Sequence, residues 1–309
     1  MKTQAILDQM ILVVLNITLW QGRKALKSGD LALNGIDVGK LPPGTLATLG
    51  SKRIISPDAV KIFMSLKRTA MKFCLNSGVR FGGDGYAIPR EKVAALNLEL
   101  KRLQEEFESA KTDFLAVYEE EVEKWIALNL PEWTPIIRAA VDSPRHIQKA
   151  LSFNYSAFDV KVPTDIAVNG LEAEVNSLYG QLCHEVRVVA SYAFENSFVG
   201  KQEITHKTLR PIKAIREKLA GMLFLDPSIA ETIQVIDDTL YKLPETGVIK
   251  GTDLNMVAGL VGRQLANMGR VVEGPPEPEE ERTEEPEVMV PVITVPQNTG
   301  KVAPIAWDF

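Results

Sequence analysis

The chain has 309 residues, of which 45% are apolar and 24% are charged. These values are typical of a globular protein, and they exclude a collagen-like, a mucin-like or a wholly disordered chain. The length predicts one or two domains. The two cysteines, Cys74 and Cys183, argue against a disulfide scaffold and for a reducing compartment, where we expect both to be small core residues.

The net charge of −5 is unevenly distributed along the chain. Residues 273–309 contain nine acidic and two basic residues, a net charge of −7, which leaves +2 for residues 1–272. The acidic stretch is also rich in proline, and such a composition cannot form a packed core. We therefore predict a helical body over residues 1–272 and a disordered, acidic Pro/Glu-rich tail over residues 273–309.

The N-terminal region contains an apolar stretch at residues 10–20, interrupted by Asn16 and Thr18. A membrane-spanning helix needs about 20 mostly apolar residues, so this stretch is too short. Asp8 and Gln9 stand where a signal peptide has its positive region, and no cleavage pattern follows. The sequence therefore predicts a cytoplasmic protein without a membrane segment.

Two segments alternate between apolar and polar residues, with β-branched and aromatic side chains among them. They cover residues 11–20 and 153–162, and they end near Gly22 and Pro163, respectively. A period of two is typical of a half-buried strand. Because a single strand leaves its backbone polar groups unsatisfied, we expect the two segments to pair.

The strongest helical pattern lies between Pro89 and Pro131. Its apolar residues follow spacings of three and four, which is a heptad seam: Val93, Leu96, Leu100, Leu103, Phe107, Ala110, Phe114 and Val117. The seam then shifts by one position to Tyr118, Val122 and Trp125, as expected for a straight helix of 3.6 residues per turn. The spacing predicts a helix over residues 90–129.

A second long helix is predicted over residues 169–199, where seven apolar residues line one face: Leu171, Val175, Leu178, Leu182, Val186, Val189 and Ala193. Because each long helix has a stripe that must be covered, we expect an antiparallel coiled-coil hairpin. Ser56, Pro57 and Gly78 mark the start and the end of a further helix, which precedes both long helices in the chain. Shorter helices follow at 208–224, 228–242 and 252–268. The fold class is mainly α with a small β element.

Residues with the potential for catalysis do not form a recognised motif. His184-Glu185 begins like a zinc-protease helix, but Val188 occupies the position of the second histidine. Cys183 and His184 are adjacent on a helix and therefore point about 100° apart. We predict no catalytic residue, cofactor or metal site. A hydrolase that uses His184 and Glu185 remains the third-ranked alternative.

The glycine-rich segment 78–86 lacks the Gly-Lys-Ser/Thr ending of a phosphate-binding loop. We interpret it as a tight loop between helices that requires positive φ at several glycines. Arg80 and Tyr86 in such a constrained loop are candidates for contact with a partner.

Basic residues form two clusters, around residues 61–80 and 207–218. The candidate nucleic-acid patch consists of Lys67, Arg68, Lys72, Lys207, Arg210 and Lys213. Such a patch neutralises phosphates without reading sequence. Acidic residues interrupt both clusters and no aromatic set accompanies them, so solvated helix faces are the favoured interpretation. Nucleic-acid binding is the alternative.

The end of the tail places two aromatic residues beside a carboxylate, in Trp307-Asp308-Phe309. A short motif of this kind, carried on an acidic tether, can place its rings in a pocket while basic groups bind the carboxylate. We predict that these three residues bind a protein partner. A frayed terminus is the alternative interpretation.

Several short blocks together resemble an uncharacterised family of bacterial and phage proteins, defined only as a domain of unknown function. The blocks are Leu19-Trp20-Gln21-Gly22-Arg23, Leu49-Gly50-Ser51-Lys52-Arg53, Arg80-Phe81-Gly82-Gly83 leading to Tyr86-Ala87-Ile88-Pro89, and Ile215-Arg216-Glu217-Lys218-Leu219. The resemblance covers about residues 10–265 and omits the tail.

What this resemblance implies is a partner and not a reaction. Members of the family occur on phages and mobile elements, often beside a MoxR-type AAA+ ATPase and a von Willebrand A-domain protein. We therefore expect a non-enzymatic interaction or adaptor protein of such a system, located in the host cytoplasm where a phage encodes it. Nucleic-acid binding through the basic helix faces is the alternative function.

Overall fold

The structure is a computed structural model that describes residues 2–32, 35, 37–162 and 169–270. Residues 1–269 form one compact unit. The predicted tail, including Trp307, Asp308 and Phe309, lies outside the described residues, so its order and its role remain predictions.

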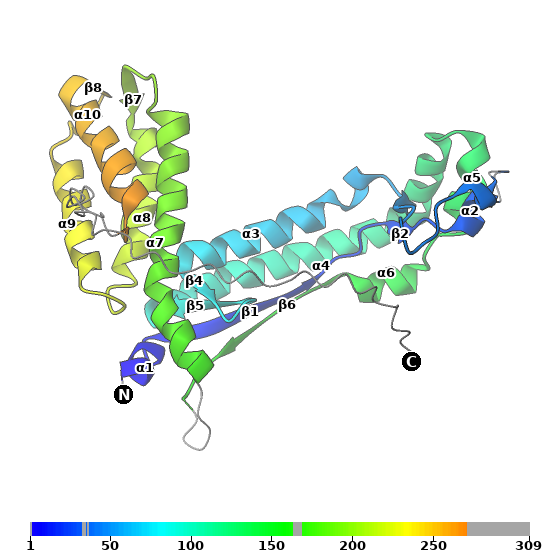
Figure 1. The fold of residues 1–309 in the computed structure, drawn as a ribbon, viewed down its shortest axis with the longest axis horizontal. Coiled ribbons are helices and arrows are strands. Elements are labelled where there is room, and N and C mark those ends of the chain that lie inside the picture. Colours follow the sequence, from blue (N-terminus) through cyan, green and yellow to red (C-terminus); the bar gives the residue numbers. More distant parts are fainter. Residues whose placement is uncertain (1, 33–34, 36, 163–168, 271–309) are drawn as a thin grey trace, which may run out of the picture. The chain divides into compact units, whose positions relative to one another are not determined.

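A four-stranded antiparallel sheet lies at the centre of this unit (Figure 1). Its order is β4 (Val79–Phe81), β5 (Gly85–Pro89), β1 (Met10–Thr18) and β6 (Ser152–Phe158). The predicted pairing of the two alternating segments is confirmed, because β1 and β6 are adjacent, with Leu12 opposite Phe158 and Thr18 opposite Ser152. Both strands are shorter than predicted.

The alternation along β1 separates a buried face from an exposed one. Val13 and Ile17 are buried in a core that also contains residues of α3 (Lys61–Ser77) and α4 (Arg90–Ala127), whereas Asn16 and Thr18 are exposed. Successive residues of a strand point to opposite faces, so a period of two in the sequence becomes one covered and one open face.

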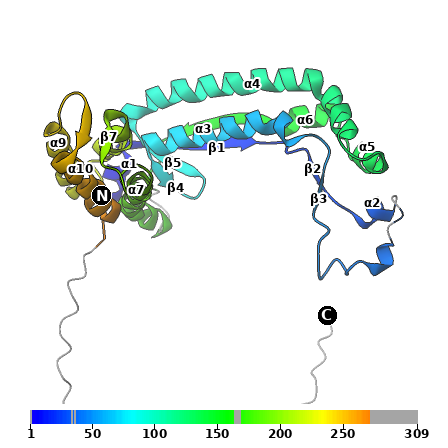
Figure 2. The same cartoon turned by 90° about the horizontal axis from the view of Figure 1, so that it is seen from above.

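Helices α3 and α4 lie side by side (Figures 1 and 2). Phe63 of α3 meets Phe107 of α4 edge to face, with ring centroids 5.0 Å apart. The predicted seam of α4 is confirmed: Leu96, Leu100, Leu103, Phe107 and Phe114 are all buried. The predicted shift is confirmed as well, because the Val117 side chain is 42% exposed, whereas Tyr118 is 1% exposed.

The predicted coiled-coil hairpin of the two long helices is not confirmed. The stripe of α4 packs against α3, the sheet and α6 (Pro144–Ala150). The stripe of α7 (Asn169–Ser197) belongs to a different core, with α1 (Lys2–Leu7), α8 (Arg210–Ala220) and the C-terminal helical segment. Val189 is an exception: it was predicted on the buried stripe, but it is 44% exposed and lies outside that core. Each stripe requires an apolar partner but does not specify which one, and nearer segments supply it.

The remaining elements are short. The N-terminal half adds β2 (Arg23–Ala25), α2 (Ser28–Ala32), β3 (Ser51–Arg53) and α5 (Thr134–Arg138), together with 3₁₀ turns at Val38–Lys40, Pro57–Val60 and Pro131–Trp133. The C-terminal part adds β7 (Glu203–Thr205), a 3₁₀ turn at His206–Leu209, α9 (Ser228–Tyr241), β8 (Val248–Lys250) and α10 (Gly251–Gly259), which continues in π-helical and 3₁₀ turns over Leu260–Gln264 and Leu265–Asn267. The fold is therefore mostly helical with small antiparallel sheets, as predicted.

The glycine-rich segment corrects one prediction. It is not a loop between helices but the β4–β5 hairpin, which adds two strands to the sheet. Gly82 and Gly83 in its turn have φ values of 60° and 80°, so the expectation of positive φ is confirmed. Strands this short carry too few residues for their period of two to be recognised in the sequence.

None of the described helices is both long enough and apolar enough to cross a membrane.

Candidate functional site: an apolar groove with basic side chains

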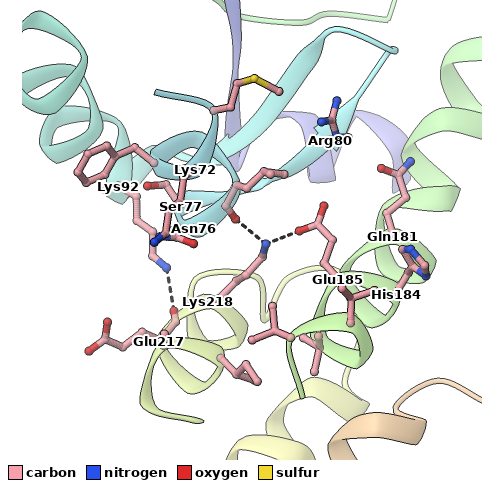
Figure 3. A pocket seen from close by; sticks show the side chains of 18 of the residues that line it. Lys72, Asn76, Ser77, Arg80, Lys92, Gln181, His184, Glu185, Glu217 and Lys218 are labelled. Atoms are coloured by element: carbon pink, nitrogen blue, oxygen red, sulfur yellow. Dashed lines mark hydrogen bonds and ion pairs between the residues drawn. The ribbon is translucent and has the colours of Figure 1, made fainter. Parts of the chain in front are cut away.

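An open cavity of about 1380 Å³ lies between α3, the first turns of α4, α7 and α8, with β4 at one side. Its apolar side chains include Met71 and Leu75 of α3, Val186, Val188 and Val189 of α7, and Ile215 of α8. Its lining also contains cationic and anionic side chains: Arg68, Lys72, Arg80, Lys92, Lys218, Glu185 and Glu217. Figure 3 shows most of these polar residues. We call this cavity the α3–α7–α8 groove.

Amphipathic helices produce the mixed lining. In α3, one face buries Phe63, Leu66, Ala70 and Cys74 against the core, and the neighbouring face presents Arg68 and Lys72, both exposed, to the groove. The 3.6-residue period places residues two positions apart on different faces, so one helix supplies both core and groove.

Lys218 is the most enclosed cation of the groove, with a side chain that is 12% exposed. Its ammonium forms an ion pair with Glu185 of α7 and donates a 2.5 Å hydrogen bond to the carbonyl of Leu75 (Figure 3). That carbonyl is one of the last four of α3, which have no partner inside the helix. Burial lowers the pKa of Lys218, and the contact with Glu185 opposes this shift. Lys218 therefore connects α8 to both α3 and α7.

Lys92 makes a second cross-link at the other side of the groove. Its ammonium donates a 2.8 Å hydrogen bond to the backbone carbonyl of Glu217, and burial lowers its pKa. The side chain passes close to Gly221, where an added Cβ would lie 2.7 Å from the Lys92 Cε atom. A larger residue at position 221 would therefore displace this lysine.

The side chains of Arg68, Lys72 and Arg80 have no hydrogen bond or ion pair to any described residue, and all three residues are exposed. Arg80 lies over the ring of Tyr86, 5.7 Å from its centroid, in a cation–π arrangement. Tyr86 itself is only 3% exposed, so of the two predicted partner residues Arg80 is the one presented to solvent. The groove thus exposes three positive charges that the described chain does not neutralise.

The six residues of the predicted nucleic-acid patch do not form one site within the groove. Arg68 and Lys72 line it, but the ammonium of Lys67 points elsewhere and donates a 3.1 Å hydrogen bond to the carbonyl of Ile17. The second cluster is exposed and does not line the groove: Lys207 lies in the 3₁₀ turn before α8, and Arg210 and Lys213 lie in the first turns of α8.

Sequence reasoning missed Lys92, and it recognised Lys218 only as a member of the second basic cluster, without its ion pair to Glu185. Lys218 and Glu217 lie in one of the blocks that carry the family resemblance, and Arg80 lies in another. That these two blocks border the same groove follows from the tertiary structure, because residues 80 and 218 are far apart in the chain.

The two cysteines are buried, as predicted, and burial raises the pKa of both thiols, that of Cys74 to about 12. Cys183 belongs to the core, whereas His184 is exposed and lines the groove, so the two do not face each other. Within the part of the chain that the structure describes, no three His, Cys, Asp or Glu side chains are placed to hold a metal ion.

Comparison with known proteins identifies the family. A family model described as "Protein of unknown function (DUF3150)" matches residues 7–265. No curated protein and no solved structure matches the chain. The expected resemblance to a domain of unknown function is therefore confirmed over most of the body. Because the match spans far more than half of the sequence, the chain belongs to the DUF3150 family of proteins of unknown function.

Proposed function

We propose that this protein is a non-enzymatic adaptor that binds a protein partner in the α3–α7–α8 groove. One observation carries the proposal: an open groove of about 1380 Å³ combines an apolar floor with three exposed cations that no described residue neutralises. Protein interfaces have this composition, with an apolar centre and charged groups that orient the partner.

The family resemblance suggests which partners to examine first. It implies a phage or mobile-element system, with a MoxR-type AAA+ ATPase or a von Willebrand A-domain protein as the partner. The proposal is that one of these proteins occupies the groove. Trp307, Asp308 and Phe309 are proposed, from the sequence, as a second contact with a partner.

Site-specific photo-crosslinking in the source cells tests this function. A photoreactive benzoylphenylalanine at Val188, which is 55% exposed and lines the groove, is compared with the same residue at Tyr241 of α9, which is 91% exposed and lies outside it. We expect a discrete protein adduct from position 188 and none from position 241. Mass spectrometry identifies the adduct. Equal labelling at both positions, or none at either, would contradict the proposed function.

Nucleic-acid binding has less support from the geometry. Lys67 is engaged with a backbone carbonyl, and Lys207, Arg210 and Lys213 do not line the groove that contains Arg68 and Lys72, so the basic residues do not form one continuous track. If phosphate contacts nevertheless dominate, a gel shift will weaken steeply with rising salt and on neutralisation of Lys67, Arg68 and Lys72. No shift at low salt, also after residues 273–309 are deleted, would dismiss this alternative.

A further inference from the structure

We propose that the ligand of the groove is a peptide segment of the partner protein in which carboxylates stand next to large apolar side chains. This inference rests on the proposed function and specifies the chemistry of the partner. It follows from three features of the described residues: an apolar strip that leaves the groove, a set of cations without partners, and a mostly aliphatic apolar lining.

The apolar floor continues onto the surface of α7. Val188 and Val189 line the groove and are 55% and 44% exposed, and Tyr192, one turn further along the helix, is 70% exposed. Residues at i and i+4 lie on one face of a helix, so Val188 and Tyr192 extend the floor in one direction. No described segment covers this strip, which is therefore available to apolar groups of a ligand.

The charges of the groove divide into two groups. Lys218 and Lys92 are held by partners inside the fold, through Glu185 and the Glu217 carbonyl. Arg68, Lys72 and Arg80 are open to solvent and are not neutralised by the described chain. The ion pair and hydrogen bonds thus position the helices, while the three open cations are available to a ligand. A ligand that complements them carries several negative charges.

A peptide fits this combination better than a nucleic acid does. Nucleic-acid grooves pair a track of cations with aromatic rings on which bases stack. Here the rings of the lining are those of Phe73 and His184, Tyr192 lies beyond it on α7, and the other apolar side chains are aliphatic or Met71. Such a floor suits leucine-like or aromatic side chains of a peptide, which a phosphate backbone does not supply.

Fluorescence polarisation with synthetic peptides tests the inference. The probe is a fluorescein-labelled peptide of about twelve residues in which glutamates alternate with leucine and tryptophan. Two matched peptides replace the glutamates by lysines or the apolar residues by serines. We expect the intact chain to bind the probe, and each replacement to weaken binding by about tenfold or more.

Charge reversals in the protein provide the matched control. The double variant Arg68→Glu/Lys72→Glu changes two exposed cations of the groove, and Lys207→Glu/Lys213→Glu changes two exposed cations outside it. Both shift the net charge equally, so a long-range charge effect predicts equal losses. We expect about a tenfold loss for the first variant and less than about a twofold loss for the second. Circular dichroism checks that both variants are folded.

Four results would overturn the inference: no binding of the probe to the wild type, equal weakening by the two double variants, undiminished binding of the serine peptide, or tighter binding of a labelled single-stranded DNA than of the probe. The proposed function is judged separately by crosslinking at Val188. A specific adduct without peptide binding means that the groove is an interface for a partner of different chemistry. Peptide binding without an adduct supports the inferred chemistry and contradicts the proposed function in the source cells.

Discussion

The two long helices, α4 and α7, differ in how completely the described chain covers their apolar side chains. Both carry an apolar stripe that is buried in the structure, in α4 by α3 and the sheet and in α7 by α1, α8 and the C-terminal turns. Helix α7 also carries a second strip, formed by Val188, Val189 and Tyr192, that the described chain leaves exposed. The charged face of α4, by contrast, forms ion pairs along the helix, for example between Arg102 and both Glu99 and Glu106.

This difference distinguishes apolar side chains that stabilise the fold from apolar side chains that are available to a partner. A stripe that finds partners inside the chain stabilises the fold, because burying apolar area is favourable. A strip that stays exposed beside cations has no such role in the isolated chain and is therefore the better candidate for a partner surface. Substitutions of covered and of exposed side chains test whether stability depends on the former and not on the latter.

Phe107→Ala is expected to cost about 3–5 kcal/mol of unfolding free energy. Phe107 is 0% exposed and contacts the rings of Phe63 and Phe153, so its removal leaves a cavity between α3, α4 and the sheet. Urea denaturation measures the change. The matched control on the same helix is Leu98→Ala, at a residue that is 70% exposed, with an expected change within about 0.5 kcal/mol. Similar losses for both would show that α4 is not covered as described.

Lys218→Met is expected to destabilise the protein by about 2–4 kcal/mol, because the carboxylate of Glu185 loses its partner in a poorly hydrated position. The double variant Lys218→Met/Glu185→Met removes both charges and should recover at least half of this loss. Thermal and urea denaturation of the wild type, of the single variants Lys218→Met and Glu185→Met and of the double variant form a double-mutant cycle. Additive losses would indicate that the ion pair does not connect α7 and α8.

Val122→Ala is expected to cost about 2 kcal/mol, from lost burial and the cavity left behind. Val117→Ala removes the same atoms from the position where the uninterrupted heptad would continue. Because Val117 is 42% exposed and Val122 is 4% exposed, the cost at Val117 should stay below about 0.5 kcal/mol. A larger loss at Val117 than at Val122, measured by urea denaturation, would mean that the seam of α4 does not shift after Phe114.

The double variant Val188→Ser/Tyr192→Ser is expected to change stability by less than about 0.5 kcal/mol, since both side chains are largely exposed. The contrasting variant on the same helix is Leu182→Ser, at a residue that is 0% exposed, which should unfold at much lower urea concentration. Strong destabilisation by the first variant would indicate that another part of the chain covers the strip, and the comparison between α4 and α7 would fail.

Local patterns predicted much of this fold because they depend on neighbouring residues. Ser56 accepts a hydrogen bond from the Asp58 amide, and Gly78 follows the last residue of α3, as the capping pattern indicates. The heptad spacing predicted α4 and its buried residues. The β4–β5 hairpin was missed, because two short strands around a glycine turn have no distinctive period.

The candidate site was harder to predict, because its parts come from distant segments. The basic residues at 68 and 72 were recognised, but their grouping with Lys207, Arg210 and Lys213 does not correspond to the groove. Lys92 and Lys218 both donate to backbone carbonyls, which every residue carries, and the Glu185 carboxylate that pairs with Lys218 is 33 positions away in the chain, so no sequence pattern marks these partners.

The amino-acid sequence by itself determined the long helices, the two longest strands and most of the residues that these elements bury, because these properties follow from periods of 3.6 and 2 residues. Only the tertiary structure decided which buried faces meet. An apolar stripe is complementary to any other apolar stripe, so α4 pairs with α3 and the sheet instead of with α7. That choice leaves part of α7 uncovered beside the cations of α3 and β4, and it creates the groove on which the proposed function depends.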